Sequence, residues 1–128
     1  MTDFNTVHIR TQGQRENITW FKERRNRLTA SMFGRICKRR RTTPTDNLIK
    51  SMFYKTGFLK TSAVLYGVEH EECAIKKFLL QTNVKVESCG LFVDHQYPYL
   101  GASPDGIIDN ETIVEVKCLF KIKHLKIK

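Results

Sequence analysis

The chain has 128 residues, of which 41% are hydrophobic and 27% are charged. This length suits one domain of ordinary size, and this composition is typical of a globular rather than a disordered protein. The formal net charge is +9, from 22 lysines and arginines against 13 aspartates and glutamates. Such an excess favours a polyanionic partner, nucleic acid first and an acidic membrane surface second. No stretch approaches the roughly 20 apolar residues that cross a bilayer, and the N-terminus lacks the apolar core of a secretory signal.

The N-terminal part of the sequence changes character after its first 16 residues. These are polar and lack periodicity, so we expect a flexible arm over residues 1–16 and one domain over 17–128. Two helical pieces follow within residues 18–41. Thr19 is expected to cap the first piece and Thr29 the second.

A basic run, Lys38–Arg41, ends the second helical piece before a proline that stops the helix. The run is either a DNA-facing patch or a nuclear import signal, and we favour contact with DNA. The four cysteines lie far apart and form no CxxC pair, which is typical of reduced thiols in an intracellular protein. We therefore expect an intracellular location, the nucleus in a eukaryote and otherwise the cytoplasm.

The rest of the chain divides into helices and then strands. A short helix is expected around residues 48–53, a turn at Gly57 and a long helix over about 63–81. From residue 84 the pattern favours extended chain, with a last strand from about 112 to 119. Turns are expected at 97–99, 103–106 and 109–110. Helices followed by a small sheet indicate an α/β or α+β fold.

The last strand and the turn before it carry acidic and basic side chains. Alternate residues of a strand share a face, so Glu115 and Lys117 point the same way, about 7 Å apart. A carboxylate and an ammonium group in this arrangement can hold a cation and a water between them. Asp105 lies ten residues earlier, either as a metal carboxylate with a glycine beside it or as part of a type I turn. Taken singly, a turn and a solvated charge pair are the favoured interpretations.

Glu71 lies in the middle of the face of the long helix that should be buried. At 100° per residue, six small or apolar residues fall within about 60° of it: Val64, Gly67, Val68, Ala74, Ile75 and Phe78. A buried carboxylate needs a partner, a proton or a metal, whereas a boundary residue reaches solvent. Gly67, one turn away, suggests close packing.

These residues together would form a metal site. Mg²⁺ prefers oxygen ligands, so Glu71, Asp105 and Glu115 would suffice, and Lys117 would orient a water for metal-assisted phosphodiester hydrolysis. A phosphate pocket is also conceivable at the start of the second helical piece, from Ser31, free N–H groups and the upstream arginines. Ordinary helix capping is the favoured interpretation on spacing alone.

Four segments carry a resemblance to a known family. They are TWFKERRNRLTASMFGRI (19–36), YGVEHEECAIKKF (66–78), GLFVDHQYPYLGASPDGIID (90–109) and IVEVKC (113–118). In order and spacing the sequence resembles the lambda-exonuclease-like, YqaJ-type viral recombinase nucleases of the PD-(D/E)XK superfamily. The resemblance implies an α/β, restriction-endonuclease-like core of N-terminal helices followed by a small mixed β-sheet.

The resemblance also implies a role for each matching residue. The implied catalytic residues are Asp105, Glu115 and Lys117. The implied metal ligands are Glu71, Asp105, Glu115 and the backbone carbonyl of Val116. Arg24 and Ser31 match the pair that grips a DNA 5′-phosphate, and Arg25 and Arg27 are expected to assist in DNA binding.

The implied activity is Mg²⁺-dependent 5′→3′ digestion of one strand of linear double-stranded DNA, with Mn²⁺ as an alternative ion. The implied role is DNA recombination or repair. The implied partners are double-stranded DNA ends, a single-strand annealing protein and further copies of the chain in a trimer, with no membrane partner.

Two departures from the family stand at the C-terminal end. Leu119 replaces the proline that usually follows the ExKC motif, and the sequence ends 11 residues after Lys117. The further helix and strands of the family are not in the sequence, so we expect a C-terminally incomplete nuclease domain. The alternatives are a catalytically inactive DNA-binding remnant from a viral gene or mobile element and, less favoured, a basic adaptor.

Overall fold

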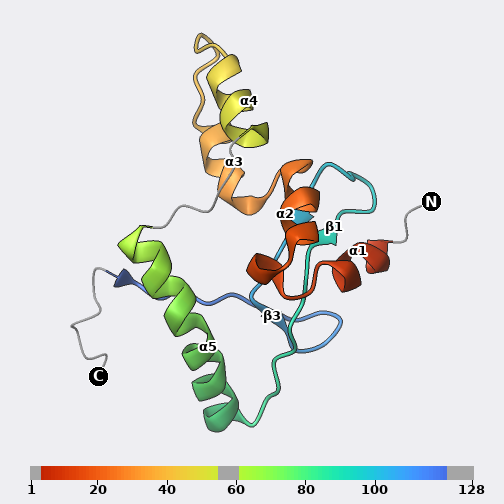
Figure 1. Cartoon of the computed structure of the whole chain (residues 1–128), viewed down its shortest axis with the longest axis vertical. Coiled ribbons are helices and arrows are strands. Elements are labelled where there is room, and N and C mark those ends of the chain that lie inside the picture. The colour runs from red at the N-terminus through yellow and green to blue at the C-terminus, as the bar shows by residue number, and fades with distance from the viewer. Residues whose placement is uncertain (1–3, 55–60, 121–128) are drawn as a thin grey trace. The chain divides into compact units, whose positions relative to one another are not determined.

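The computed structural model describes residues 4–54 and 61–120 (Figure 1). The chain divides into two compact units. Unit 1 comprises Met1–Thr56 and Ser88–Pro104, and unit 2 comprises Gly57–Glu87 and Asp105–Lys128. The turn predicted at Gly57 lies outside the described residues. Within those residues, no helix is long and apolar enough to cross a membrane.

Unit 1 contains most of the helices and one small sheet. Its helical elements are α1 (Phe4–Arg10), the short 3₁₀ helix η1 (Gln14–Glu16), α2 (Ile18–Arg25), α3 (Ala30–Cys37) and α4 (Asp46–Phe53). Strands β1 (Phe92–Val93) and β2 (Gly101–Ala102) pair antiparallel. The helices α3 and α4 lie side by side (Figure 1), where Arg35 Nη2 donates to Ser51 Oγ at 2.7 Å.

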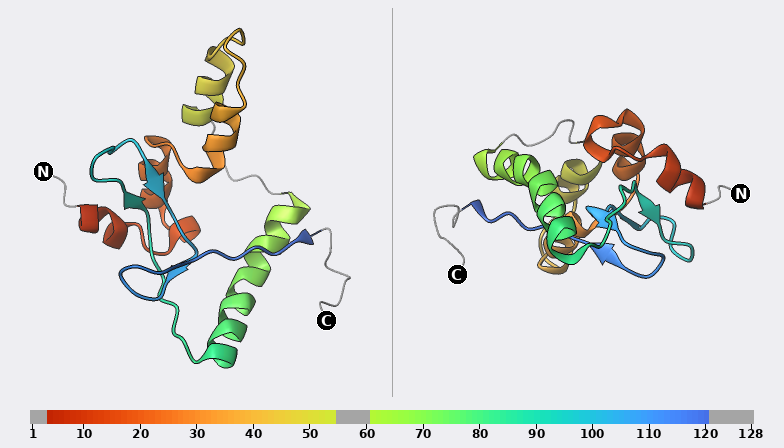
Figure 2. Two further views of the ribbon diagram at one scale, coloured as in Figure 1. Left: turned by 180° about the vertical axis from the view of Figure 1, so that it is seen from behind. Right: turned by 90° about the horizontal axis from the view of Figure 1, so that it is seen from below.

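The N-terminal segment is folded, so the prediction of a flexible arm is wrong for residues 4–16. Helix α1 packs beside β1 (Figure 2) and buries Val7. The Leu91 N–H donates to the buried Thr11 Oγ1 at 2.7 Å, and the Gly90 N–H donates to His8 Nδ1 at 3.1 Å. These partners lie about 80 residues away in sequence, so local periodicity could not reveal them.

The buried core of unit 1 joins the N-terminal helices to β1. It consists of Val7, Trp20, Leu91 and Val93. Burial of such apolar side chains is the main favourable contribution to folding.

The N-terminal ends of α2 and α3 are capped differently from what the sequence predicted. The piece starting at Ile18 is capped by Asn17, whose Oδ1 accepts from the Thr19 N–H at 2.9 Å, so the prediction of Thr19 as the cap is wrong. Asn17 lies one residue before α2, where a side-chain oxygen can reach the free N–H groups of the first turn. Thr29 does occupy the N-cap position of α3, but its side chain makes no capping hydrogen bond.

Unit 2 combines one long helix with a short hairpin. Helix α5 (Ser62–Thr82) is capped by Thr61 Oγ1, which accepts from the Val64 N–H, and it ends at Asn83 in the left-handed conformation. Strands β3 (Gly106–Ile107) and β4 (Ile113–Val114) pair antiparallel. The long and short helices predicted around 63–81 and 48–53 are therefore confirmed as α5 and α4.

The strands are shorter than predicted. The strand expected over 112–119 pairs only at Ile113 and Val114, because the next inward N–H, that of Val116, donates to the Asp105 carboxylate instead of to a strand carbonyl. Across the described residues the strands form two antiparallel pairs, β1–β2 and β3–β4, and not the single mixed sheet that we expected.

Candidate active site and phosphate-binding residues

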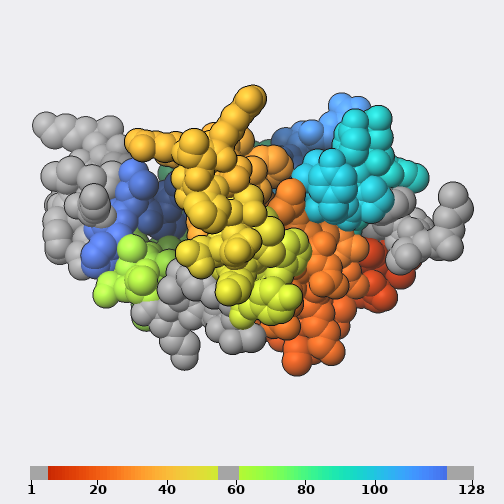
Figure 3. Space-filling view, turned by 90° about the horizontal axis from the view of Figure 1, so that it is seen from above, coloured from red at the N-terminus to blue at the C-terminus, as the bar shows by residue number. Residues whose placement is uncertain are grey.

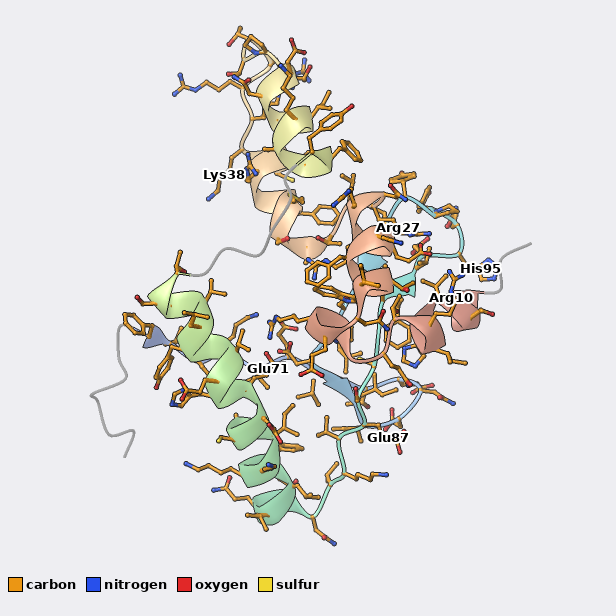
Figure 4. The ribbon with its side chains drawn as sticks, in the orientation of Figure 1. Arg10, Arg27, Lys38, Glu71, Glu87 and His95 are labelled. Carbon is orange, nitrogen blue, oxygen red and sulfur yellow. The ribbon has the colours of Figure 1, made fainter. Side chains whose placement is uncertain are left out.

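Helix α5 presents Glu71 on its least exposed face. Figure 4 shows Glu71 about midway along the helix. Five of the six surrounding residues that the periodicity indicated are half-buried with it: Val64, Gly67, Val68, Ala74 and Ile75. Phe78, the sixth, is 36% exposed, so the face is half-buried rather than fully buried. The suggestion of close packing at Gly67 is wrong: apart from its chain neighbours and the backbone of the same helix, no atom of the described residues lies within 4 Å of the position that a Cβ would take.

Asp105 is held in place by two hydrogen bonds, one to β4 and one to the chain just after β4. Its backbone N–H donates to Val114 O at 3.0 Å, and its Oδ2 accepts from the Val116 N–H at 2.6 Å. Gly106 follows without a side chain because a Cβ there would collide with Val86 Cγ1. The bend at Asp105 thus fixes a half-buried carboxylate in a defined orientation next to β4.

Lys117 interacts with the three predicted carboxylates of unit 2, one by a hydrogen bond and two through their charge. Its Nζ donates directly to Glu115 Oε1, so the two side chains do point the same way. This hydrogen bond raises the pKa of Lys117, burial opposes the increase, and the nearby charges of Glu115, Asp105 and Glu71 add to it. Three carboxylates from three segments therefore act on one ammonium group.

The donor set of this cluster fits a hard divalent cation in chemistry. Carboxylate and carbonyl oxygens are the ligands that Mg²⁺ prefers, and two or three carboxylates suffice because the ion keeps several waters. Within the described part of the chain, however, no three Asp, Glu, His or Cys side chains lie at metal-ligand spacing. Glu115 and Asp105 instead engage Lys117 and the Val116 N–H.

Unit 1 contains the predicted phosphate-binding residues. The guanidinium carbon of Arg24 lies 4.3 Å from the centre of the Trp20 ring, and Nη2 donates to Thr29 Oγ1 at 3.3 Å. Thr29 Oγ1 in turn shares a hydrogen bond of 3.2 Å with Ser31 Oγ. Burial lowers the pKa of Arg24, as does the nearby charge of Arg15. The structure therefore brings Arg24 and Ser31 together through Thr29.

The two other predicted DNA-binding arginines differ from Arg24. Arg25 is exposed. Arg27 is half-buried, and its Nη1 donates to both the backbone carbonyl and the carboxylate of Glu23, at 2.8 and 2.5 Å. Its Nε donates to Pro98 O at 3.1 Å, and Glu23 also pairs with Arg10. Arg27 is thus part of an internal network that joins α1 and α2 to the loop before β2.

The basic run Lys38–Arg41 lies between α3 and α4, and this segment is at the surface in the space-filling view (Figure 3). Lys38, Arg40 and Arg41 are exposed, whereas Arg39 is half-buried and its Nη2 donates to Thr43 O at 2.9 Å.

Two residues that contact Arg24, Trp20 and Thr29, were not among the predicted phosphate-binding residues. Trp20 and Arg24 are four residues apart on α2, a spacing that places side chains on one face and could have indicated the ring–guanidinium contact. Thr29 was interpreted only as a cap. Its contact with Arg24 depends on the path of the chain between α2 and α3, for which the sequence carries no local signal.

The chain matches one protein family over most of its length. The family model described as the YqaJ-like viral recombinase domain matches residues 19–128. Among solved structures, LHK-Exo in complex with dAMP is 25% identical to the chain with a TM-score of 0.66. A second structure, of the alkaline exonuclease LHK-Exo from Laribacter hongkongensis, is 26% identical with a TM-score of 0.62.

Both structural comparisons cover the two chains unequally. Each covers 82% of this chain and 55% of LHK-Exo, so this chain spans about half the length of that protein. No curated protein sequence matches the chain.

Proposed function

Because the chain belongs to the family of YqaJ-like viral recombinase domains, we propose that it is a metal-dependent DNA exonuclease domain. The proposed reaction is hydrolysis of one strand of linear double-stranded DNA from its 5′ end, with Mg²⁺ or alternatively Mn²⁺. The similarity to an alkaline exonuclease supports this reaction class. The observation that carries the proposal is the hydrogen bond from Lys117 to Glu115, with Asp105 and Glu71 near enough for their charges to act on the same ammonium group.

The metal ligands in this proposal are three side chains and one backbone group. Glu71, Asp105 and Glu115 would supply carboxylate oxygens, and Val116 would supply its carbonyl oxygen. The chemistry that Mg²⁺ supplies when bound is polarisation of a phosphoryl oxygen and a lower pKa for water. The Val116 N–H keeps Asp105 oriented through its hydrogen bond to Oδ2.

Lys117 acts in this scheme as a charged hydrogen-bond donor. Because its pKa is raised, chiefly by the hydrogen bond to Glu115, it stays protonated at neutral pH and cannot serve as a general base. An ammonium group near the scissile phosphate can orient a water and offset the negative charge that develops in the transition state. Lys117 is therefore proposed to stabilise the transition state of the reaction.

Arg24 and Ser31 form the proposed site for the 5′-terminal phosphate. A guanidinium group offers planar donors that match phosphate oxygens, and a hydroxyl adds a further donor. The structure supports this role through the chain of contacts from Arg24 to Thr29 and from Thr29 to Ser31. Arg25, which is exposed, is a proposed backbone contact, whereas Arg27 is removed from the proposed set by its contacts with Glu23.

The biological setting follows from the proposed reaction. Digestion of one strand leaves a single-stranded end, so the proposed role is DNA recombination or repair with a single-strand annealing protein as partner. A trimer of the chain and an intracellular location belong to the same proposal.

The nuclease assay that tests this function uses linear duplex DNA with 5′-phosphate ends. We expect loss of DNA with Mg²⁺, no loss with EDTA, and a rate at least about 100-fold lower for Lys117→Ala, since removing one group that stabilises transition-state charge costs about 10²–10³. A matched control is Lys85→Ala, in an exposed lysine that pairs with Glu87. Full activity of Lys117→Ala would contradict the proposal.

A DNA-binding module without turnover is the second candidate. It is favoured by the missing three-ligand cluster among residues 4–54 and 61–120. Equal retention of DNA with Mg²⁺, with EDTA and with Lys117→Ala would identify this module. Its gel shifts should weaken steeply as the salt concentration increases.

A further inference from the structure

We propose that Tyr66 and Phe120 are positioning residues for the candidate active site: the contact between their rings anchors the segment that carries Glu115 and Lys117 to helix α5. The proposal rests on the proposed function, because it assigns the contact that holds the lysine and one carboxylate of that site in place. All residues of the contact belong to unit 2.

The segment after β4 lies outside a strand ladder. Pairing in β4 ends at Val114, and residues 115–119 continue without strand pairing. The Val116 N–H donates to Asp105 Oδ2 at 2.6 Å, which fixes the segment near its start. A chain outside a ladder lacks the row of hydrogen bonds that fixes a paired strand. The position of Lys117 therefore depends on contacts further along the segment as well.

Three aromatic rings, which we call the aromatic cluster, make such a contact on α5. The Phe120 ring meets the Tyr66 ring edge to face, with centroids 5.6 Å apart and planes at 71°. The Tyr66 ring is stacked with His70, with centroids 3.9 Å apart and planes at 26°. All three side chains are half-buried, and Figure 2 shows the end of the described chain beside α5. The segment is thus attached on both sides of Lys117, at Val116 and at Phe120.

Contacts within α5 fix the orientation of the Tyr66 ring. His70 follows Tyr66 by four residues, a spacing that places two side chains on one face of a helix. His70 Nδ1 lies 2.9 Å from Tyr66 O, and because a carbonyl oxygen only accepts, Nδ1 is the donor. This hydrogen bond fixes the His70 ring against which Tyr66 stacks. An edge-to-face pair contributes beyond the area that it buries, so Phe120 gains a defined position and not merely an apolar surface.

The aromatic cluster connects the segments that supply charged groups to the candidate site. Glu71 follows His70 directly on α5, and its charge acts on Lys117. The hydrogen bond from Lys117 to Glu115 lies within one segment, so it cannot hold that segment against the helix. The contact between Tyr66 and the end of the segment does so, and it thereby relates the position of Lys117 to that of Glu71.

Cys118 provides a reporter of this segment that depends on neither metal nor DNA. It is half-buried, whereas Cys73 on α5 is exposed. The protein is treated with a maleimide in EDTA, and peptide mass spectrometry measures the labelling rate of each thiol. We expect Phe120→Leu and Tyr66→Leu to increase the rate at Cys118 relative to Cys73 about five-fold, the equivalent of one lost aromatic pair.

Two control variants separate the aromatic cluster from general stability. Tyr66→Phe keeps both ring contacts, so its labelling should equal that of wild type. Phe78→Leu removes a ring of α5 that is 36% exposed and lies outside the aromatic cluster, and it should leave Cys118 labelling unchanged. An equal increase in Phe78→Leu and Phe120→Leu would indicate general loosening and would overturn the proposal. Phe120→Leu remains informative if Tyr66→Leu does not fold.

Nuclease kinetics give a second readout, specific to positioning. Because the aromatic cluster orients Lys117 and does not bind DNA, we expect Tyr66→Leu and Phe120→Leu to lower kcat about ten-fold and to leave KM for duplex DNA unchanged. Tyr66→Phe should retain the wild-type kcat. Faster labelling of Cys118 together with a wild-type kcat would overturn the positioning role.

The outcomes also distinguish this proposal from the proposed function. If Lys117→Ala is as active as wild type, the proposed function fails, and the positioning role fails with it even where labelling shows that the ring contact exists. If Lys117→Ala is inactive while Tyr66→Leu and Phe120→Leu keep wild-type labelling and kcat, the proposed function stands and the role of the aromatic cluster is overturned.

Discussion

Arg24 and Arg27 lie three residues apart and have different surroundings. Arg24 lies over an indole ring beside two hydroxyl groups, in a setting suited to an anion. Arg27 is paired with the Glu23 carboxylate and two backbone carbonyls. The same residue type therefore has a proposed role in binding at one position and a role in stability at the other.

The two arginines should respond oppositely to substitution. We expect Arg27→Ala to lower the free energy of unfolding by about 1–2 kcal/mol, because it removes a half-buried ion pair and leaves carbonyls without their donor. It should leave the preference for 5′-phosphate ends unchanged. Arg24→Ala should abolish that preference at little cost in stability. Urea unfolding measures the stability of each variant, and the ratio of the dissociation constants for 5′-hydroxyl and 5′-phosphate duplexes measures the preference. A reversed result would exchange the two assignments.

The sequence could predict some residues of the candidate site and not others. Glu115 and Lys117 follow from strand alternation, and their contact holds although the paired strand ends at Val114. Glu71 follows from the helical period, which is a local property. The hydrogen bond from Trp20 to Ser103 spans 83 residues, so no local pattern could indicate it.

At the scale of elements, α1 shows the same difference between local patterns, which the sequence reveals, and contacts distant in sequence, which it does not. Its burial depends on a close approach to Gly90, where a Cβ would collide with His8 O and with Thr11. The helices α2 to α5 carry a local signal in their sequence and were predicted, although Asn17 and not Thr19 caps α2. A helix whose apolar contacts all lie far away in sequence resembles a polar arm when only neighbours are considered.

Two glycines provide a matched test of this docking. We expect Gly90→Ala to lower the free energy of unfolding by about 1–3 kcal/mol, because the new methyl group must displace the α1 backbone. Gly34→Ala should raise it by up to about 1 kcal/mol, because within the described residues nothing lies within 4 Å of the new Cβ and alanine favours the helix. Urea denaturation measures both changes. A stabilising Gly90→Ala would show that α1 does not dock there.

His8 makes the docking of α1 depend on pH. Its Nδ1 accepts from the Gly90 N–H and its ring stacks on Phe92 with a centroid distance of 4.4 Å. Burial lowers the pKa of His8 from its ordinary 6.5. The unfolded chain therefore binds the proton more readily than the folded one. The contribution of His8 to stability is complete above about pH 6.5 and is lost as the pH falls through the lower folded pKa.

The corresponding prediction compares wild type with His8→Asn. The Asn side chain keeps an acceptor near the Gly90 N–H but does not titrate. Between about pH 8 and pH 5, we expect the urea midpoint of wild type to fall more than that of His8→Asn. Parallel profiles for the two proteins would mean that His8 does not titrate differently in the folded state.

At the scale of the whole molecule, charge and family membership both support the proposed DNA substrate. A net charge of +9 favours association with a polyanion, and the family match extends over residues 19–128. The chain spans about half the length of LHK-Exo. The carboxylates and the lysine proposed for catalysis nevertheless all lie within unit 2, and the proposed phosphate-binding residues all lie within unit 1.

The most direct measurement of the central claim is calorimetric titration of the protein with Mn²⁺. We expect saturable binding by wild type, and at least about ten-fold weaker binding by Glu71→Gln, Asp105→Asn and Glu115→Gln, since each change removes one charged oxygen ligand of a shared site. Glu72→Gln, next to Glu71 but paired with Lys76 on the exposed face, should bind as wild type does. Wild-type affinity in all three variants, or no binding by wild type, would contradict a common metal site at Lys117.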